Sequence, residues 1–464
     1  MINKHSGSRF LLLIIAAFSL FIDASATARG RSNWHVGLGR RIITPQNNDV
    51  WLGGYGRKRV AENVIHDLWV KVMVLKSPDG KRIVLVTTDH MGMSKTVYES
   101  IYSRVNQRFK IDRADFMLTF SHNHCGPCLR DDLIDYYPSD DDQHKAVEKY
   151  TDWMENQVLD AIGDALAKWQ PAQLLMGEGD CTFAVNRREN PEAEVPGMIG
   201  AGIPFKGVVD HYVPVLAVKS LKGKLLGVLF GYACHPTTLS INSWCGDYPG
   251  FAQINLESSH PGVTAMFFNA CGADQNPLPR RTIELCEKYG RMLSDAVEKV
   301  LADPMKPVSP VIRTSFKSAG LAYEEIVTRE KLVPIAGGNA SVQERWAKRM
   351  LNLIDRDTIF PTSTTYPVQA CKLGKELLMI GIGGESVVDY SLRFKREYGQ
   401  GTWVCGYAGY MVAYIPSRRV WEEGGYEGGP HLDEYGHPAW RWRNDVEERI
   451  AEKVHQVVND VKDE

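Results

Sequence analysis

The sequence predicts an α/β fold in which layered, mixed β-sheets are flanked by helices. Short apolar runs rich in β-branched residues alternate along the chain with longer segments of helical periodicity. No repeat or low-complexity linker interrupts this alternation. With 464 residues, 44% of them hydrophobic, the chain can bury one large core or two moderate ones. We expect a single domain over residues 33–464, although this length exceeds the usual range for a domain.

Buried strands are predicted at residues 68–75, 83–88, 116–120, 213–218, 225–230, 263–268 and 377–382, where apolar residues run without a break. A helix is predicted over residues 147–166, because its apolar side chains recur on one stripe. The same periodicity predicts helices over residues 285–301 and 446–461. Residues 323–355 are polar and helical, and we expect them to form an excursion that covers one edge of the functional site.

The first residues have the pattern of an export signal. Lys4 and Arg9 precede an apolar run over residues 10–22, which is short for a stable membrane-spanning helix. Small residues at Ala24, Ala26 and Ala28 then provide cleavage sites. We therefore predict a signal peptide over residues 1–28 and a periplasmic or secreted protein with no transmembrane segment after cleavage. A permanent N-terminal anchor is the alternative.

Charge and cysteine content restrict the remaining possibilities. Lys and Arg number 54 against 56 Asp and Glu, so no overall basic field attracts nucleic acid, and we expect no nucleic-acid partner. Nine cysteines cannot all pair within one chain, so at least one thiol should be free or buried. Neither the disulfide pairing nor the oligomeric state is predicted.

Two histidines follow the predicted strand at residues 116–120, in Ser121-His122-Asn123-His124-Cys125-Gly126-Pro127. Residues two apart in an extended segment project to the same side, so both imidazoles would face one site. The pair is a candidate for a metal ligand and its polar neighbour, and two structural histidines are the alternative.

The same loop contains Cys125-Gly126-Pro127-Cys128, which has the spacing of a thioredoxin-type redox pair. Its place in a histidine-rich loop, late in a long α/β chain, favours the metal-site interpretation. Haem attachment would need His where Leu129 stands. Oxidoreductase chemistry is kept as an alternative.

Two more strand ends carry polar side chains. His235 follows the strand at residues 225–230, and Glu385 follows a glycine-rich turn after residues 377–382. Sites in α/β proteins collect at such strand ends. Zinc prefers nitrogen and oxygen ligands of these types. The alternative for Glu385 taken alone is that it is simply a helix N-terminal carboxylate.

In the order in which these motifs occur, the chain resembles the neutral ceramidases and their bacterial relatives. The opening Val36-Gly37-Leu38-Gly39-Arg40, Thr44-Pro45 and Gly54-Tyr55-Gly56 are similar to that family's first strand and glycine turn. The later similar segments are Ser121 to Pro127, Asn186-Arg187, His235-Pro236, Gly246-Asp247, Gly250-Phe251-Ala252, Glu385, Tyr414 and Tyr426-Glu427-Gly428.

The resemblance implies a Zn²⁺ ion held by His122, His235, Glu385 and Tyr414. It also implies that His124 lies beside the ion as a hydrogen-bonding group and that Arg187 lines the substrate cleft. Without the resemblance, Tyr414 would be interpreted as a core aromatic.

Two departures from the family pattern affect the expected substrate. The segment that corresponds to the family's Gly-Asp-Val-Ser-Pro-Asn reads Gly272-Ala273-Asp274-Gln275-Asn276-Pro277, so Asn276 or Gln275 occupies the place of the serine nucleophile. Neither side chain forms an acyl intermediate by the usual route, and either would instead contact substrate. We also expect no counterpart of the family's C-terminal immunoglobulin-like domain, and ceramide itself is not the expected substrate.

We therefore predict a zinc-dependent hydrolase that cleaves an amide or ester bond, N-acyl or O-acyl, with metal-activated water. His124 would stabilise the oxyanion, and Asp274 or Asp247 would act as general base. The substrate would be a small molecule, a lipid or an oligosaccharide.

Two alternatives from other classes remain. A zinc-dependent lyase for an acidic saccharide would use Tyr414 or a histidine to remove a proton, with Trp440 and Trp442, which flank Arg441, available for sugar stacking. The other alternative is a catalytically silent binding protein.

Overall fold

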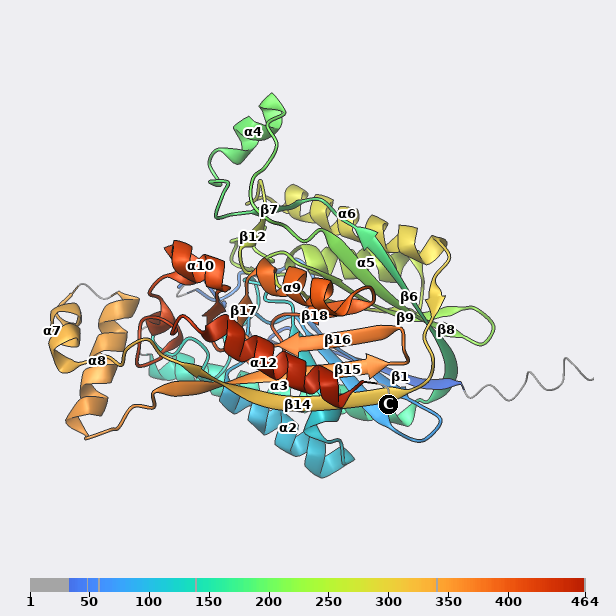
Figure 1. Ribbon diagram of the computed structural model, residues 1–464, viewed down its shortest axis with the longest axis horizontal. Coiled ribbons are helices and arrows are strands. Elements are labelled where there is room, and N and C mark those ends of the chain that lie inside the picture. The colour runs from blue at the N-terminus through green and yellow to red at the C-terminus, as the bar shows by residue number, and fades with distance from the viewer. Residues whose placement is uncertain (1–32, 48, 57–58, 138–139, 339–340, 463–464) are drawn as a thin grey trace, which may run out of the picture. The chain divides into compact units, whose positions relative to one another are not determined.

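The computed structural model describes residues 33–47, 49–56, 59–137, 140–338 and 341–462 (Figure 1). Residues 34–464 form one compact unit. The predicted signal peptide lies outside the described residues. Among the described residues, no helix has both the length and the apolar character that crossing a bilayer requires.

The larger of two main sheets has nine strands. Its order is β11-β9-β8-β6-β1-β3-β4-β5, with β13 paired to β6. The strands are β1 (Trp34–Ile42), β3 (Trp69–Lys76), β4 (Arg82–Thr88), β5 (Phe116–Phe120), β6 (Gln170–Asp180), β8 (Tyr212–Ser220), β9 (Leu225–Tyr232), β11 (Thr264–Asn269) and β13 (Lys306–Pro307). The pairs β4–β5 and β9–β11 are parallel, and the others are antiparallel.

The second main sheet has the order β14-β15-β16-β18 and is built from the C-terminal part of the chain. Its strands are β14 (Ile312–Ala322), β15 (Ser363–Leu373), β16 (Leu377–Ile382) and β18 (Thr402–Cys405). Three two-stranded pairs complete the β-structure: β2 (Asn63–Val64) with β10 (Ser243–Trp244), β7 (Ala184–Asn186) with β12 (Gln275–Pro277), and β17 (Glu385–Ser386) with β19 (Tyr414–Ile415).

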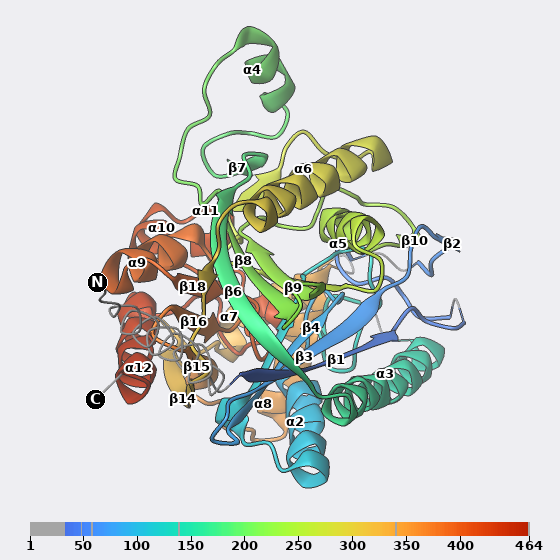
Figure 2. The same ribbon diagram turned by 90° about the vertical axis from the view of Figure 1, so that its right-hand side faces the viewer.

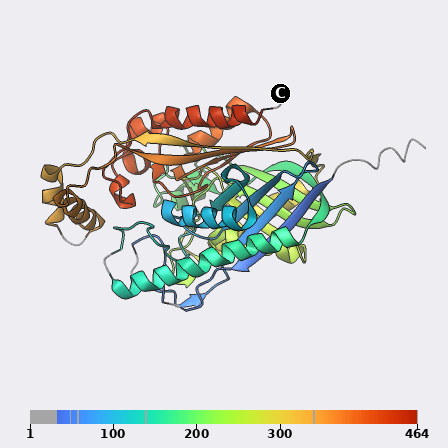
Figure 3. The same ribbon diagram turned by 90° about the horizontal axis from the view of Figure 1, so that it is seen from below.

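Helices cover the outer faces of both sheets (Figures 2 and 3). The nine-stranded sheet carries α2 (Lys95–Phe109), α3 (Asp141–Ala167), α5 (Asp247–Ser259) and α6 (Ile283–Ala302), and the four-stranded sheet carries α9 (Val388–Tyr398) and α12 (Val446–Asp460). The shorter helices are α4 (Val195–Ala201), α7 (Arg329–Ala336), α8 (Val342–Asp355), α10 (Arg418–Glu423), α11 (Gly425–Gly428), and the 3₁₀ turns η2 (Arg113–Asp115) and η3 (Leu432–Tyr435).

The two sheets face each other across a shared apolar core. Met73 and Phe268 of the nine-stranded sheet belong to one buried cluster with Met379 and Trp403 of the four-stranded sheet. The rings of Phe268 and Trp403 stack with their centroids 6.2 Å apart. The molecule is therefore layered as helices, sheet, sheet and helices, because each sheet buries one face against the other and one against helices.

Helix α3 approaches β1 closely because β1 carries glycines at the contact. A side chain at Gly37 would place its Cβ 1.8 Å from the carbonyl oxygen of Ala165, and one at Gly39 would lie 2.1 Å from that of Ala161. Only glycine permits this approach of helix backbone to strand. The glycines in the opening motif thus fix the packing of the longest helix on the sheet.

The predicted fold class is confirmed. All seven predicted strands are present, with ends that differ from the predicted ones by no more than two residues, and the three predicted helices correspond to α3, α6 and α12. The excursion at residues 323–355 contains α7 and α8, which lie at one end of the molecule (Figure 1). There, Arg349 of α8 forms an ion pair with Asp135, in the loop that follows β5.

Candidate metal centre

The loop after β5 turns sharply to present two histidines. Strand β5 ends at Phe120, and His122 has a φ of 64°, in the left-handed region that non-glycine residues rarely adopt. The segment is therefore not an extended strand, and the prediction that His122 and His124 share one face of such a strand is wrong. The turn nevertheless brings the two rings together, with Nε2 of His124 3.2 Å from Nε2 of His122.

Backbone carbonyl groups orient two of the imidazole rings. Nδ1 of His122 lies 2.6 Å from the carbonyl oxygen of Met91, and Nδ1 of His235 lies 3.3 Å from that of Gly272. Each carbonyl accepts a hydrogen bond from an Nδ1–H group, which leaves the Nε2 lone pair available to a metal ion.

The Nε2 atoms of three histidines converge from two loops. Nε2 of His122 is 3.0 Å from Nε2 of His235, and all three ligand atoms, including that of His124, lie within 4.8 Å of one another. Ligands at 2.0–2.1 Å around a tetrahedral zinc ion are about 3.3 Å apart. The spacing therefore fits a single ion between these nitrogens.

A carboxylate from the C-terminal part of the chain completes the cluster. Glu385 Oε2 lies 3.1 Å from Nε2 of His122 and 3.3 Å from Nε2 of His235. The other oxygen, Oε1, accepts a hydrogen bond of 2.5 Å from the hydroxyl group of Tyr435. The parallel pairing of β17 with β19 sets Glu385 opposite Tyr414, which brings the fourth predicted ligand to the same place.

The charge states of His235 and Glu385 suit a cation. Burial, together with the positive charge of Arg187, lowers the pKa of His235 well below its usual value, so its imidazole is neutral. Burial alone would raise the pKa of Glu385, but His122 and hydrogen bonds outweigh it and the pKa is lowered. Neutral imidazoles and an ionised carboxylate are the forms that bind divalent metals.

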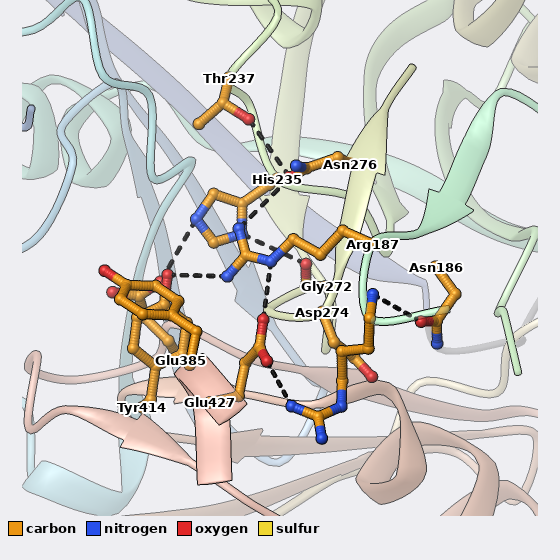
Figure 4. A network of polar contacts seen from close by, with 12 residues as sticks. Asn186, Arg187, His235, Thr237, Gly272, Asp274, Asn276, Glu385, Tyr414 and Glu427 are labelled. Atoms are coloured by element: carbon orange, nitrogen blue, oxygen red, sulfur yellow. Dashed lines mark hydrogen bonds and ion pairs between the residues drawn. The ribbon is translucent and has the colours of Figure 1, made fainter. Parts of the chain in front are cut away.

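Arg187 connects the cluster to its surroundings (Figure 4). Its guanidinium group donates to the Tyr414 hydroxyl at 3.1 Å, to Glu427 Oε1 at 2.7 Å and to Asn276 Oδ1 at 3.4 Å. Burial and the charge of Glu385 raise the pKa of Tyr414 well above its usual value, although Arg187 opposes this. The Tyr414 hydroxyl therefore keeps its proton in the absence of a metal.

A pocket of about 40 Å³ opens beside the histidines. It is lined by Gly54, Tyr55, Met91, His122, His124, Asp132, Leu133, Tyr136, Glu385, Met411, Tyr414, Tyr426, Glu434 and Tyr435. Asp132 and Leu133 also line a larger neighbouring cavity of about 320 Å³, whose walls include Trp51 and Tyr137. A small pocket lined by several titratable side chains thus lies next to a space large enough for part of a substrate.

Residues 34–276, which contain all three histidines and Arg187, match the family described as neutral/alkaline non-lysosomal ceramidase, N-terminal. The chain belongs to this family. The predicted resemblance to the neutral ceramidases is confirmed.

Individual ceramidases are more distantly related. Neutral ceramidase 1 of Arabidopsis thaliana is 24% identical over 303 residues, which cover 64% of this chain but only 38% of that protein. The crystal structure of neutral ceramidase from Pseudomonas aeruginosa superposes with a TM-score of 0.67 at 19% identity, covering 87% of this chain and 73% of that one. A structure titled "Ceramidase complexed with C2" gives a TM-score of 0.66 at 17% identity, covering 91% and 76%. These structures share the ceramidase fold.

Two predicted site residues have structural partners in this ceramidase-family chain. The carboxylate of Asp247 accepts hydrogen bonds from the backbone N–H groups of Thr238, Leu239 and Tyr248. The side-chain amide of Gln275 bonds to the carbonyl of Ala233 and the N–H of Asp210. Both side chains are thus engaged with backbone groups, and neither is among the described residues that line the pocket.

Two other predicted site residues, Asn276 and Asp274, lie closer to the metal-binding cluster. Asn276 reaches it through Arg187, and its Oδ1 is also 3.5 Å from the Thr237 hydroxyl. Asp274 accepts a hydrogen bond from the N–H of Val388 through Oδ1, while Oδ2 has no hydrogen-bond partner among the described residues. Burial raises the pKa of Asp274 to about 7.

The redox interpretation of Cys125-Gly126-Pro127-Cys128 has no support in the local structure. The segment is a turn rather than the start of a helix, and both cysteines are buried. The helix N-terminus that lowers the pKa of a thiol in such pairs is therefore missing from this described segment.

Sequence reasoning missed several residues that surround the cluster, chiefly Tyr435, Asp132 and Glu434. Asp132 lies in a loop, and Glu434 and Tyr435 lie in the single 3₁₀ turn η3, so no periodic pattern marked them. Glu427 belongs to the Tyr426-Glu427-Gly428 motif, which contributed to the family resemblance, but the sequence analysis gave Glu427 no role. Its place in a family motif was the one signal that could have identified it as a site residue.

Proposed function

We propose that the protein is a zinc-dependent hydrolase that cleaves an amide or ester bond of an acylated substrate. The observation that carries the proposal is the convergence of three histidine Nε2 atoms and the Glu385 carboxylate beside a pocket. His122, His235 and Glu385 would hold the ion, with Tyr414 within reach of it. When bound, a divalent ion of this kind supplies a Lewis acid and lowers the pKa of a coordinated water.

The side chains around the cluster supply binding and proton transfer. His124 lines the pocket and, with its ring 4.7 Å from that of Tyr55, is placed to donate a hydrogen bond to the oxygen of a reacting carbonyl group. Arg187 holds the Tyr414 hydroxyl and fixes its direction. Neither role requires a serine.

Asp132 is our candidate for the general base. Its carboxyl group lines the pocket with His122 and His124, and burial raises its pKa to about 7. A carboxylate with this pKa can accept a proton near neutral pH and return it to a leaving group. Asp274 has a similar pKa but is not among the described residues that line the pocket.

The absence of a serine from Gly272-Ala273-Asp274-Gln275-Asn276-Pro277 supports direct attack by water rather than an acyl-enzyme. Asn276 accepts a hydrogen bond from Arg187 and is our candidate for the residue in the place of the serine, although it is not among the described residues that line the pocket. Replacing Asn276 with Ser tests the assignment: formation of a covalent acyl-enzyme by the variant would show that residue 276 occupies the nucleophile's place.

The lining of the pocket favours an uncharged or cationic polar group over an anionic one. Asp132 and Glu434 add two carboxyl groups to that of Glu385, and five tyrosines surround them. A uronate would bring a further negative charge into this space, which costs energy in a buried site. The lyase alternative for an acidic saccharide is therefore not our proposal.

The test is turnover of N-acyl, O-acyl and uronate-containing substrates by purified protein, with and without a chelator. We expect chelator-sensitive release of a carboxylic acid from an acyl substrate, and restoration by added Zn²⁺. Turnover that persists without metal, or an ultraviolet-absorbing unsaturated product from a uronate, would contradict the proposal. His260→Gln is the control variant, because His260 pairs with Glu298 at the surface.

We also propose that the protein acts in the periplasm or outside the cell. Support comes from the basic, apolar and small-residue pattern of residues 1–28. N-terminal sequencing of the mature protein should give a start just after Ala26 or Ala28. An intact N-terminus on protein recovered from the cytoplasm would contradict this proposal.

A further inference from the structure

A second cluster of reactive side chains lies outside the candidate metal centre. Sγ of Cys245 lies 3.3 Å from Nε2 of His66, and Cys245 and Cys286 belong to one buried cluster. Both cysteines are fully buried. Cys245 stands between β10 and α5, Cys286 lies in the first turns of α6, and the pairing of β10 with β2 brings His66 alongside. Three elements distant in sequence thus bring two sulfur atoms and an imidazole together.

His66 is oriented to accept the Cys245 proton. Its Nδ1 lies 3.2 Å from the carbonyl oxygen of Asp67, to which an Nδ1–H donates, so Nε2 carries the lone pair. The ring is clamped: a Cβ at Gly250 would lie 2.3 Å from its Cε1, and Phe251 packs edge-on with ring centroids 4.9 Å apart. The N–H of Gly246 also points at Nε2, at 3.3 Å.

The electrostatics single out Cys245 among the buried thiols. The hydrogen bond from Cys286 lowers the pKa of Cys245 to about 6, and His66 adds to this, although burial and Asp247 oppose it. Burial instead raises the pKa of five others, Cys181, Cys234, Cys271, Cys371 and Cys405. Asp89 faces His66, and Cys125 faces Cys286. Thiolates rather than thiols are the nucleophiles in disulfide exchange.

We propose that Cys245 and Cys286 form a thiol–disulfide site, in which His66 activates Cys245 and Cys286 is the resolving thiol. His66 takes the proton of Cys245, and the Cys245 sulfur attacks one sulfur of an incoming small disulfide, which releases a thiolate that is protonated. The Cys286 sulfur then attacks Cys245 and displaces the second thiolate, which receives the Cys286 proton. The incoming disulfide is reduced to two thiols as the protein pair is oxidised, so electrons and protons balance.

A surface hollow gives a small reagent an approach to the buried pair. The hollow measures about 730 Å³, and its lining includes Ile65, Ser243 and Ile283. Ile65 precedes His66, Ser243 is two residues from Cys245, and Ile283 is one helical turn before Cys286. Residues next to His66, Cys245 and Cys286 in the sequence therefore form part of the wall of this hollow.

The site is joined to the loops that carry the metal-centre histidines. The N–H of Cys245 donates to the carbonyl oxygen of Cys125, the residue after His124. Two residues on, Asp247 holds the N–H groups of Thr238 and Leu239, just after His235. A disulfide between Cys245 and Cys286 would tie this segment covalently to α6.

The test uses the full chain and hydroxyethyl disulfide as the reagent, without denaturant, followed by alkylation and peptide mapping by mass spectrometry. We expect a Cys245–Cys286 linkage to form before any other cysteine reacts. His66→Gln should slow oxidation at pH 6.5 by about fivefold or more, because the thiolate fraction falls faster than its nucleophilicity rises. In Cys286→Ser, a mixed disulfide should accumulate on Cys245.

Cys371→Ser, which removes a buried thiol elsewhere, should leave the rate and the product unchanged. The rate of Cys245 modification against pH separates activation from a structural effect, because only loss of activation moves the midpoint upward in His66→Gln. Unmodified Cys245 in the folded protein, linkage of Cys245 to Cys125, or an unchanged pH midpoint in His66→Gln would overturn the proposal. Thermal melting of each variant confirms that it is folded.

Discussion

The two parts of the chain that meet at the candidate metal centre fix their ligands in different ways. In the nine-stranded sheet and its loops, the rings of His122 and His235 are held by backbone carbonyl groups of Met91 and Gly272. In the C-terminal part, Glu385 is held by the hydroxyl group of Tyr435. A side chain can be exchanged by mutation without disturbing the chain path, whereas a carbonyl cannot. The histidines are thus fixed by the fold, and the carboxylate by replaceable neighbours.

The family match covers the part of the chain that carries the histidines but not the C-terminal part that carries Glu385. The match spans residues 34–276, which include the three histidines but neither Glu385 nor Tyr414. The superpositions on solved ceramidase structures cover 87% and 91% of the chain, so the fold extends through both parts. The family match therefore does not reach Glu385 and Tyr414, and the difference between the two parts can be tested directly.

The largest effect is expected from the histidine part. His235→Ala should abolish both metal retention and turnover, because it removes a ligand from the centre of the cluster. Metal content by mass spectrometry and turnover of the acyl substrate are measured together, with His260→Gln as the control that retains both. A fully active His235→Ala protein would show that the histidines serve another purpose.

The next effect concerns Arg187, which joins the two parts. Arg187→Met leaves the buried Glu427 carboxylate with Arg188 as its remaining ion-pair partner. Because Arg188 still compensates the Glu427 charge, the cost should stay below that of an unpaired buried charge, at roughly 2–3 kcal/mol in the free energy of unfolding. Urea unfolding measures this, and Arg418→Met, which breaks an exposed pair with Glu422, should change stability by less than about 0.5 kcal/mol. Equal effects would mean that Arg187 does not link the parts.

Acid should destabilise the histidine part through His90, whose backbone carbonyl accepts the N–H of His122. Burial lowers the pKa of His90 from 6.5 to about 3, so the unfolded chain binds the proton more readily. Stability from this residue is complete above pH 6.5 and is lost as pH falls toward 3, by up to about 1.4 kcal/mol per unit.

Urea unfolding at pH 7 and pH 4.5 measures this loss. His90→Gln should lose less stability than the wild type over that range. Equal losses in the two proteins would mean that His90 is accessible to protons in the folded state.

The smallest effect is expected from Tyr435→Phe, which removes only the hydrogen bond to Glu385 Oε1. Loss of a partner that orients a metal ligand typically weakens metal affinity 10–100-fold. Competition with a chromophoric chelator measures the metal affinity. The matched control is Tyr398→Phe, which removes a hydroxyl group that hydrogen-bonds to His455 instead of to a candidate metal ligand. Unchanged affinity in Tyr435→Phe would mean that Glu385 does not depend on this neighbour.

Much of the fold was predictable from sequence because buried strands and amphipathic helices leave periodic patterns. The strand at residues 116–120 and the helix α12 were found in this way, whereas β6 and β14 were missed because their exposed faces interrupt the apolar run. Periodicity reports burial on one face, and strands that alternate or bend give a weak signal.

The candidate site was less predictable, because it depends on where loops turn. The prediction of His122 and His124 as a pair assumed an extended segment. In the structure, the left-handed backbone conformation of His122 brings the two rings together. Asp132 lies in a loop and Tyr435 in the single 3₁₀ turn η3, and neither element leaves a periodic pattern in the sequence. The family resemblance supplied Tyr414, which the residues alone would have assigned to the core.

X-ray diffraction from crystals grown with Zn²⁺, recorded on both sides of the zinc absorption edge, addresses the metal centre most directly. We predict one anomalous peak per chain, 2.0–2.2 Å from Nε2 of His122, Nε2 of His235 and Oε2 of Glu385. No peak among these atoms, or a peak only at other residues, would contradict the account.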